Sequence, residues 1–322
     1  MRVIHHRGFP GFDLESHCRD LSGVELVGVD TPDEMAALAG TADAVMCNGA
    51  GYTEAVARAC AQPDGRLRWI QFLSTGIETA ERFGVPQRCV VTNASSVWAP
   101  AVAEHAVAMM LALKRGVQWL ERDRLARRWD RKALLAHLGT LDGAQVGILG
   151  FGGIGAAIAQ RLAGFGVTIH GFARSDRAKP GADVMHAIGA LCDVAPRLDI
   201  LCSALPLTPA TRHIVDAKVL ACLKPHAYVV NVGRGLTMDE AALAHCLAEG
   251  RLAGAALDVF ETEPLPETSP LWDMANVILS PHVAAYDGPS GWQRLGRLCR
   301  ANILRFQAGE PLSDEVIIRS LA

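Results

Sequence analysis

The chain has 322 residues, enough for two domains of ordinary size, and half of its residues are hydrophobic while a fifth are charged. Its formal net charge of -3 leaves no basic surface of the kind that binds DNA, RNA or anionic lipid. We therefore expect a globular protein with no nucleic acid and no membrane among its partners.

The nine cysteines are scattered along the chain, odd in number and never arranged as a CxxC pair. This pattern argues against a disulfide framework and a zinc site, and it favours a reducing compartment. We expect neither a signal peptide nor an apolar run of the roughly 18 residues that a membrane helix needs. The sequence thus predicts a cytoplasmic protein that holds no metal.

The first hundred residues alternate short apolar runs with helical stretches, which predicts βαβ units and parallel sheets. A helix is expected from Tyr52 to Ala61. Strands are expected at 1–4, 24–29, 44–47, 67–72 and 89–92.

A strongly apolar helix is expected from Pro100 to about Arg115, because proline suits a first helical turn, where its missing N–H costs nothing. The arginine-rich stretch from Glu121 to Lys132 follows it. Two interpretations stay open for this stretch: a solvated helix face, or an arm that contacts a second copy of the chain.

The pattern changes from Ala144, where a buried strand at 146–149 ends directly in glycines. Strand–helix alternation then continues to about residue 283, and an amphipathic helix is expected at 295–306. The fold class is therefore α/β, with two Rossmann-like domains that contain parallel sheets. We expect a dinucleotide-binding domain at 101–283, inserted into a discontinuous substrate domain made of 1–100 and 284–322.

The glycines after the strand match the GxGxxG pattern of dinucleotide-binding loops. Glycines allow a tight turn and let the backbone approach a pyrophosphate, which the free N–H groups of the following helix then receive. A tight strand–helix turn without a ligand is the alternative. The predicted cofactor-binding residues of this loop are Gly150, Gly152, Gly153, Ile154 and Gly155.

The next strand, expected at 167–172, ends at the position where NAD enzymes commonly place an acid on the ribose hydroxyls. Here that position carries Ala173, followed by Arg174 and Ser175. A guanidinium can bind a 2′-phosphate with paired donors, whereas a carboxylate would repel it. These residues favour NADP(H), with NAD possible; a surface arginine without a cofactor role is the alternative.

Long, ordered motifs accompany the glycine loop along most of the chain. They are Val102-Ala103-Glu104-His105, Leu205-Pro206-Leu207-Thr208, Asn231-Val232-Gly233-Arg234-Gly235, Asp258-Val259-Phe260-Glu261-Thr262-Glu263-Pro264-Leu265-Pro266 and Ser280-Pro281-His282-Val283-Ala284. With these motifs the sequence resembles the D-isomer-specific 2-hydroxyacid dehydrogenase family, and within it the bacterial glyoxylate/hydroxypyruvate reductases most.

The resemblance implies that Arg234, Glu263 and His282 form the catalytic trio. It also implies that Asp258 faces the nicotinamide carboxamide. Further cofactor-binding residues implied in the same way are Leu205, Pro206, Val232 and Gly233. Family members usually form homodimers through the cofactor domain, so we expect the same here.

A loop after the strand at 67–72 resembles the family segment whose backbone amides receive the substrate carboxylate. The implied substrate-binding residues are Ser74, Thr75 and Gly76, together with Arg234. This chain reads Thr75-Gly76-Ile77-Glu78, where many relatives have Ala-Gly followed by an aliphatic residue and Asp.

The chemistry suits these residue types. A guanidinium meets the planar carboxylate and carbonyl of a 2-keto acid with two donors, so Arg234 would bind the substrate and stabilise the charge that develops on its oxygen. A histidine changes protonation near neutral pH, so His282 would donate the proton, with Glu263 as its partner.

The sequence therefore predicts an NADPH-dependent reductase of a small 2-keto acid such as glyoxylate or hydroxypyruvate, giving the D-2-hydroxy acid. Two alternatives remain. One is a related dehydrogenase that acts on a different acid. The other is a binding or regulatory protein that senses nicotinamide dinucleotide on the same scaffold.

Overall fold

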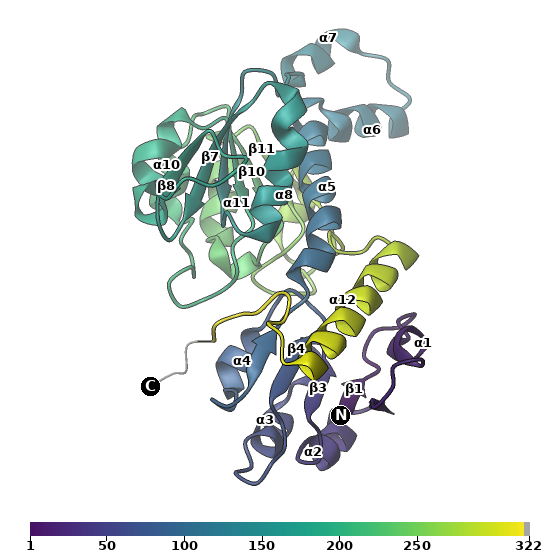
Figure 1. The fold of residues 1–322 in the computed structure, drawn as a ribbon. Helices are drawn as coiled ribbons and strands as arrows, with labels where there is room; N and C mark the ends of the chain where they lie inside the picture. The colour runs from purple at the N-terminus through teal and green to yellow at the C-terminus, as the bar shows by residue number, and fades with distance from the viewer. Residues whose placement is uncertain (319–322) are drawn as a thin grey trace. The chain divides into compact units, whose positions relative to one another are not determined.

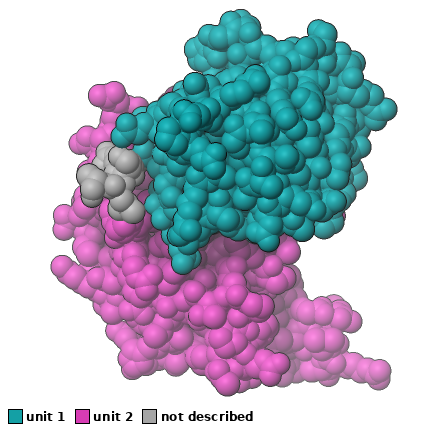
Figure 2. All heavy atoms as spheres, turned by 90° about the horizontal axis from the view of Figure 1, so that it is seen from below, with its two compact units in different colours: residues 1–98, 287–322 teal, residues 99–286 magenta. Residues whose placement is uncertain are grey.

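The computed structural model describes residues 1–318 and divides into two compact units. Unit 1 contains residues 1–98 and the C-terminal segment from Asp287, and unit 2 contains residues 99–286 (Figure 2). The end of the predicted substrate domain, 319–322, lies outside the described residues. Each unit is built on its own parallel sheet, as the predicted α/β class requires.

Unit 1 contains a five-stranded parallel sheet in the order β2-β1-β3-β4-β5, with the arrangement of flavodoxin-like folds (Figure 1). The predicted strands of this unit and the predicted helix at 52–61 are confirmed within a few residues. The strands are β1 (Arg2–His6), β2 (Glu25–Val29), β3 (Ala44–Cys47), β4 (Trp69–Phe72) and β5 (Val90–Thr92). The helices are α1 (Leu14–Cys18), α2 (Pro32–Ala39), α3 (Glu54–Cys60), α4 (Glu78–Phe83) and α12 (Pro289–Ala308).

The C-terminal helix α12 is joined to the middle of this sheet by buried hydrogen bonds. On β4, Ile70 and Phe72 face the core with α2 and α3, so Gln71 between them faces the opposite side. There the side-chain oxygen Oε1 of Gln71 accepts from Asn302 Nδ2 on α12, at 3.1 Å, and both residues are fully buried. Because buried polar groups need hydrogen-bond partners, this contact fixes the position of α12 on the sheet.

Unit 2 contains a seven-stranded parallel sheet in the order β12-β11-β10-β9-β6-β7-β8, which includes the strand order of dinucleotide-binding folds (Figure 1). The strands are β6 (Gln145–Leu149), β7 (Thr168–Ala173), β8 (Val184–Ala187), β9 (Ile200–Ser203), β10 (Tyr228–Asn231), β11 (Gly254–Leu257) and β12 (Val277–Leu279). The helices are α5 (Ser95–Lys114), α6 (Val117–Leu125), α7 (Arg131–Leu134), α8 (Gly153–Leu162), α9 (Leu191–Val194), α10 (Ala217–Cys222) and α11 (Glu240–Ala248).

Helices cover both faces of this sheet, because successive strand residues point to opposite sides. On β9, Ile200 and Cys202 pack with α5 and α8, while Leu201 packs with α9, α10 and α11. The two resulting layers of core explain why these strands are continuous apolar runs and not alternating ones.

Helix α5 begins earlier than the sequence predicts, since Pro100 is its sixth residue and not its first. The Asn93 side chain accepts from the N–H of Ser95 at 3.1 Å, and Asp314 accepts from the N–H of Ser96 at 3.0 Å. These acceptors satisfy the first turn, and Asp314 is too distant in sequence to be recognised as a cap. A proline this near the start removes one helical hydrogen bond.

The expectation of no membrane-length apolar run is also wrong, because α5 in full passes that test. Among residues 1–318 it is the one helix long and apolar enough to cross a membrane by length and composition. However, 61% of its apolar window is buried inside the protein, as in the core helix of a soluble protein.

The arginine-rich stretch forms the short helices α6 and α7, which Figure 1 shows beyond the C-terminal end of α5. Several large apolar side chains are exposed here. Trp129 is 98% exposed, and Leu125 and Leu135 are 68% and 57% exposed. A solvated helix face accounts for the charges but not for these side chains.

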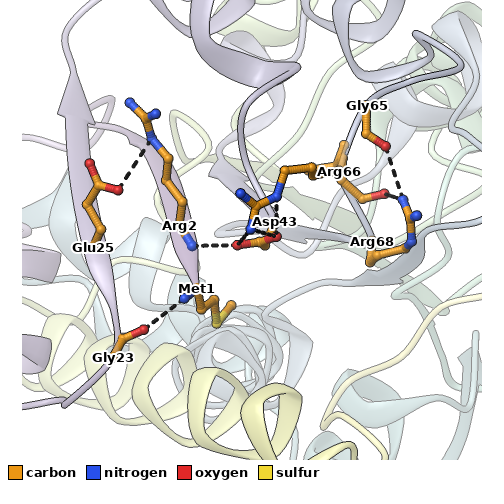
Figure 3. A network of polar contacts seen from close by, with 9 residues as sticks. Met1, Arg2, Gly23, Glu25, Asp43, Gly65, Arg66 and Arg68 are labelled. Atoms are coloured by element: carbon orange, nitrogen blue, oxygen red, sulfur yellow. Dashed lines mark hydrogen bonds and ion pairs between the residues drawn. The ribbon is translucent and has the colours of Figure 1, made fainter.

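In both sheets, an aspartate at the amino edge, where the strands begin, binds the first N–H of a strand and a cationic side chain. In unit 1 the Asp43 carboxylate accepts from the N–H of Arg2 at 2.7 Å, and it also binds the Arg66 guanidinium (Figure 3). In unit 2 Asp199 accepts from the N–H of Gln145 at 2.8 Å and from Lys224 Nζ at 2.8 Å. The amino edges are thus held by charge-assisted hydrogen bonds, which leaves the carboxyl edges free for function.

At the carboxyl edge of the unit 2 sheet, the loops pack backbone against backbone. A Cβ on Gly150 would lie 2.8 Å from the Ala204 carbonyl oxygen, and one on Gly233 would lie 2.6 Å from that of Leu205. A Cβ on Gly235 would lie 1.9 Å from the carbonyl carbon of Phe260. Three consecutive loop contacts therefore exist only because these positions lack a side chain.

We predict that Gly235→Ala destabilises the protein by about 2 kcal/mol or more, because backbone atoms must move to admit the methyl group. Chemical unfolding followed by circular dichroism measures the loss. Gly189→Ala is the matched control, since nothing lies within 4 Å of a Cβ at that position. Equal stability of the two variants would show that the Gly235 contact is not tight in solution.

Candidate active site

The glycine loop lies at the carboxyl edge of the unit 2 sheet, between β6 and α8. Gly152 is the N-cap of α8, and no side chain caps this helix end. Within residues 1–318, and apart from chain neighbours and the backbone of α8 itself, no atom lies within 4 Å of a Cβ at Gly152 or Gly153, whereas Gly155 packs against the Gly150 carbonyl oxygen. An open helix N-terminus at the strand-order reversal between β6 and β9 suits a pyrophosphate.

The segment after β7 is basic and exposed. Ala173 is the last residue of β7, and Arg174 and Ser175 follow it directly. Lys179 returns to the glycine loop, where its Nζ donates to the Phe151 carbonyl oxygen at 2.7 Å. Sequence reasoning missed Lys179, although it is the third cationic residue of this segment, after Arg174 and Arg177.

Arg234 lies in a turn that follows β10 and is fixed by three hydrogen bonds to the Arg234 carbonyl oxygen. Asn231 Nδ2 and Thr237 Oγ1 donate to it at 3.2 and 2.7 Å, and the N–H of Thr237 donates at 3.1 Å. The Gly233 N–H donates to Asn231 Oδ1 at 3.1 Å. The backbone that carries the half-buried Arg234 side chain is therefore rigid.

His282 and Glu263 meet at the same edge, on the loops that follow β12 and β11. His282 Nδ1 lies 2.6 Å from Glu263 Oε2, and Glu263 Oε1 accepts from the Phe260 N–H at 3.0 Å. Both Glu263 oxygens are thus used, while no described residue bonds to His282 Nε2. The His282 side chain is 47% exposed, so Nε2 is available to a substrate.

Asp258 holds the turn that carries His282. Its carboxylate is 1% exposed and accepts from Ser280 Oγ at 2.6 Å and from the amides of Val283 and Ala284 at 2.9 and 3.0 Å. The Asp258 carbonyl oxygen also accepts from the N–H of His282 at 2.8 Å. The Asp258 side chain thus points to the turn. That Asp258 faces the nicotinamide carboxamide stays a prediction.

Three further predicted cofactor residues lie in the neighbouring loops. Leu205 and Val232 are buried in the two core layers of unit 2, so only their backbone reaches this edge. Pro206 is exposed. The structure therefore gathers every predicted residue of unit 2 along one edge of one sheet.

The predicted substrate loop follows β4, at the carboxyl edge of the unit 1 sheet. Trp98 Nε1 donates to the Leu73 carbonyl oxygen, the Ala94 N–H to that of Ser74 and Asn93 Nδ2 to that of Thr75, at 3.0, 3.1 and 2.9 Å. Among the described residues, the amides of Thr75 and Gly76 donate to no acceptor. This loop therefore presents free N–H groups, which suit an anion.

Comparison with known proteins identifies the family of the chain. The model of the D-isomer specific 2-hydroxyacid dehydrogenase, NAD binding domain, matches residues 107–284. A glyoxylate reductase from Pyrococcus furiosus is 35% identical over 257 residues, which cover 76% of this chain and 74% of the relative. A hydroxyphenylpyruvate reductase from Plectranthus scutellarioides is 38% identical over 223 residues, which cover 68% and 69%.

Among solved structures, an NADPH-dependent glyoxylate/hydroxypyruvate reductase from Sinorhizobium meliloti, in complex with NADP and sulfate, superposes with a TM-score of 0.83. It is 27% identical, and the match covers 98% of this chain and 97% of that one. Together with the glycine loop and the ordered motifs, these matches show that the chain belongs to the D-isomer specific 2-hydroxyacid dehydrogenase family and is an NAD(P)-dependent enzyme of that type.

Proposed function

We propose that the protein reduces a small 2-keto acid, glyoxylate or hydroxypyruvate or a similar acid, to the D-2-hydroxy acid with NADPH. The observation that carries this proposal is the 2.6 Å contact between His282 and Glu263, on loops beside Arg234 and at the same sheet edge as the glycine loop. This edge combines a proton donor, its partner, a guanidinium and an anion-binding helix end.

The residues have distinct roles in the reaction. The glycine loop and the neighbouring loops of unit 2 would hold a dihydronicotinamide dinucleotide, which would supply the hydride for the carbonyl carbon. Arg234 binds the substrate and stabilises the negative charge that develops on the carbonyl oxygen. His282 donates a proton from Nε2 to that oxygen, and Glu263 holds Nδ1 so that the ring is oriented and its positive charge is stabilised.

The free amides of the loop at 74–76 support a role in binding the substrate carboxylate. Ser74, Thr75 and Gly76 are held in place because the carbonyl groups of residues 73–75 are all used inside unit 1. Backbone amides bind a carboxylate without selecting what is attached to it. The choice between small and larger acids therefore depends on other residues. A reductase of a different acid stays the alternative, because one of the relatives is a hydroxyphenylpyruvate reductase.

Preference for NADPH rests on the charge of the segment after β7. Arg174 and Ser175 follow a strand that ends without an acid, and Lys179 brings a positive charge to the glycine loop. The Sinorhizobium meliloti reductase, which has NADP bound, supports the same choice. NAD remains a usable cofactor in this proposal, because the glycine loop serves both.

We also propose that the protein is a cytoplasmic homodimer joined through unit 2. The exposed apolar side chains of α6, of Trp129 after it and of Leu135 at the end of α7 fit burial against a second copy, which favours the arm over the solvated face. All nine cysteines are free, as suits a reducing compartment.

The first test measures initial rates of NADPH and NADH oxidation with glyoxylate, hydroxypyruvate, pyruvate and phosphohydroxypyruvate. We expect turnover with NADPH on the small acids, and a loss of about 10²–10⁴-fold in kcat in His282→Ala. His245→Ala is the matched control, because His245 also pairs with a glutamate, Glu249, at 3.1 Å. Tight cofactor binding without turnover on any acid would favour the sensor alternative.

A charge reversal tests the cofactor preference. We expect Arg174→Glu to lower kcat/KM for NADPH by about 10-fold or more, with a much smaller effect for NADH, because only the former carries the 2′-phosphate. Arg197→Glu makes the same change of net charge before β9, at the amino edge of the sheet. Equal losses with both cofactors would contradict the assignment of Arg174.

Sedimentation velocity tests the dimer. We expect a dimer for the protein at micromolar concentration, and dissociation to monomers when Trp129 and Leu125 are both replaced by serine, because the buried apolar area is lost. Leu304→Ser, which removes an exposed apolar side chain from α12, is the control. A monomeric parent protein would refute the proposal.

A further inference from the structure

His213 lies where three loops of unit 2 meet. It belongs to the loop after β9, and its N–H donates to the Leu236 carbonyl oxygen at 2.8 Å. Its buried Nε2 lies 2.9 Å from Glu261 Oε1 without forming a hydrogen bond, so the contact is an ion pair when the ring is protonated. Its φ of +48° is in the left-handed region, which residues other than glycine adopt at a cost. A residue kept in this conformation is held there by its contacts.

The loop that carries His213 is the one that contains Pro206. Thr211 Oγ1 donates to the Pro206 carbonyl oxygen at 2.7 Å and accepts from the N–H of Thr208 at 2.8 Å. These bonds fold residues 206–211 into a compact turn. The position of His213 is therefore tied to the predicted cofactor-binding part of its own loop.

Glu261, the contact of His213, is fixed to the start of α11. Its Oε1 accepts from the N–H of Glu240 at 3.0 Å, and Glu240 Oε2 accepts from the N–H of Glu261 at 3.1 Å. Burial, with repulsion from Glu261, raises the pKa of Glu240. The imidazole of His213 lies beside the Glu261 carboxylate, so a positive charge on the ring would offset this repulsion.

Glu261 is also part of the turn that orients Glu263. The preceding residue, Phe260, donates its N–H to Glu263 Oε1, and its carbonyl group packs against Gly235. A shift of Glu261 moves the Phe260 amide, and with it the oxygen pair that holds His282. Pro206 is thus connected to His282 by contacts and short stretches of chain that include His213 and Glu261.

We infer that His213 and Glu261 are a pair of positioning residues that couples the loop at 205–213 to the orientation of Glu263 and His282. This inference rests on the proposed function of Glu263 and His282. Neither residue of the pair touches the substrate. Their contact keeps the Phe260 amide where it binds Glu263.

A double-mutant cycle tests the coupling. His213→Asn removes the ring contact but suits the left-handed backbone, since asparagine tolerates it well, and Glu261→Gln keeps an acceptor for the Glu240 N–H. We expect each variant to lower kcat about 5- to 30-fold with little change in KM, and the double variant to be no slower than the slower single one. His226→Asn is the matched control, because His226 lies 3.3 Å from Asp199 at the amino edge.

A second readout does not depend on turnover. Protein labelled with ¹⁵N at histidine reports the Nδ1 resonance of His282, assigned by its loss in His282→Ala. We expect this resonance to move in His213→Asn and in Glu261→Gln, in the direction seen in Glu263→Gln, and to stay in place in His226→Asn.

The outcomes distinguish a failure of the proposed function from a failure of the coupling between His213 and His282. A parent protein without keto-acid reduction would end the proposed function, yet the ¹⁵N shifts would still decide the coupling. Unchanged kcat and an unchanged His282 resonance in both single variants would overturn the positioning role, as would additive losses in the double variant. A lower Tm alone would show a structural brace and would also overturn it.

Discussion

The absence of any side chain at Gly235 is the constraint on which the candidate site depends. The turn that carries Arg234 lies against the Phe260 carbonyl group at a distance that leaves no room for a Cβ. Phe260 in turn orients Glu263, and Glu263 orients His282. The geometry of the turn that carries Arg234 and of the Glu263–His282 pair is therefore set by a single backbone contact, supported by the similar contacts of Gly150 and Gly233.

Stability and chemistry occupy opposite edges of each sheet. At the amino edges, Asp43 and Asp199 make the same hydrogen bonds to the first residues of β1 and β6. At the carboxyl edges, polar groups remain available: the amides of Thr75 and Gly76 in unit 1, and His282 Nε2 in unit 2. The loops at the carboxyl edges can vary because the strands are anchored elsewhere.

Local signals were sufficient for most of the fold. The apolar runs gave the strands of unit 1 within a few residues, and the glycines after β6 identified the helix N-terminus of α8. The start of α5 could not be predicted, because one of its caps, Asp314, reaches it only in the folded chain. The same reason applies to His213 and Lys179, whose partners Glu261 and Phe151 are distant in sequence. Asp258 illustrates a further limit, since a motif names the residue but not the direction of its side chain.

The hydrogen bond between Asn302 and Gln71 has a consequence for how the protein is made. These residues are separated by the whole of unit 2 in sequence, yet both are fully buried in unit 1. As the ribosome extends the chain, unit 2 is complete before α12 has been synthesised. Until then one face of the first sheet, with the polar groups of Gln71, stays uncovered. The nascent chain thus passes through a stage in which its later half can be native while its earlier half is not, and a chaperone that shields an exposed sheet face would act at that stage.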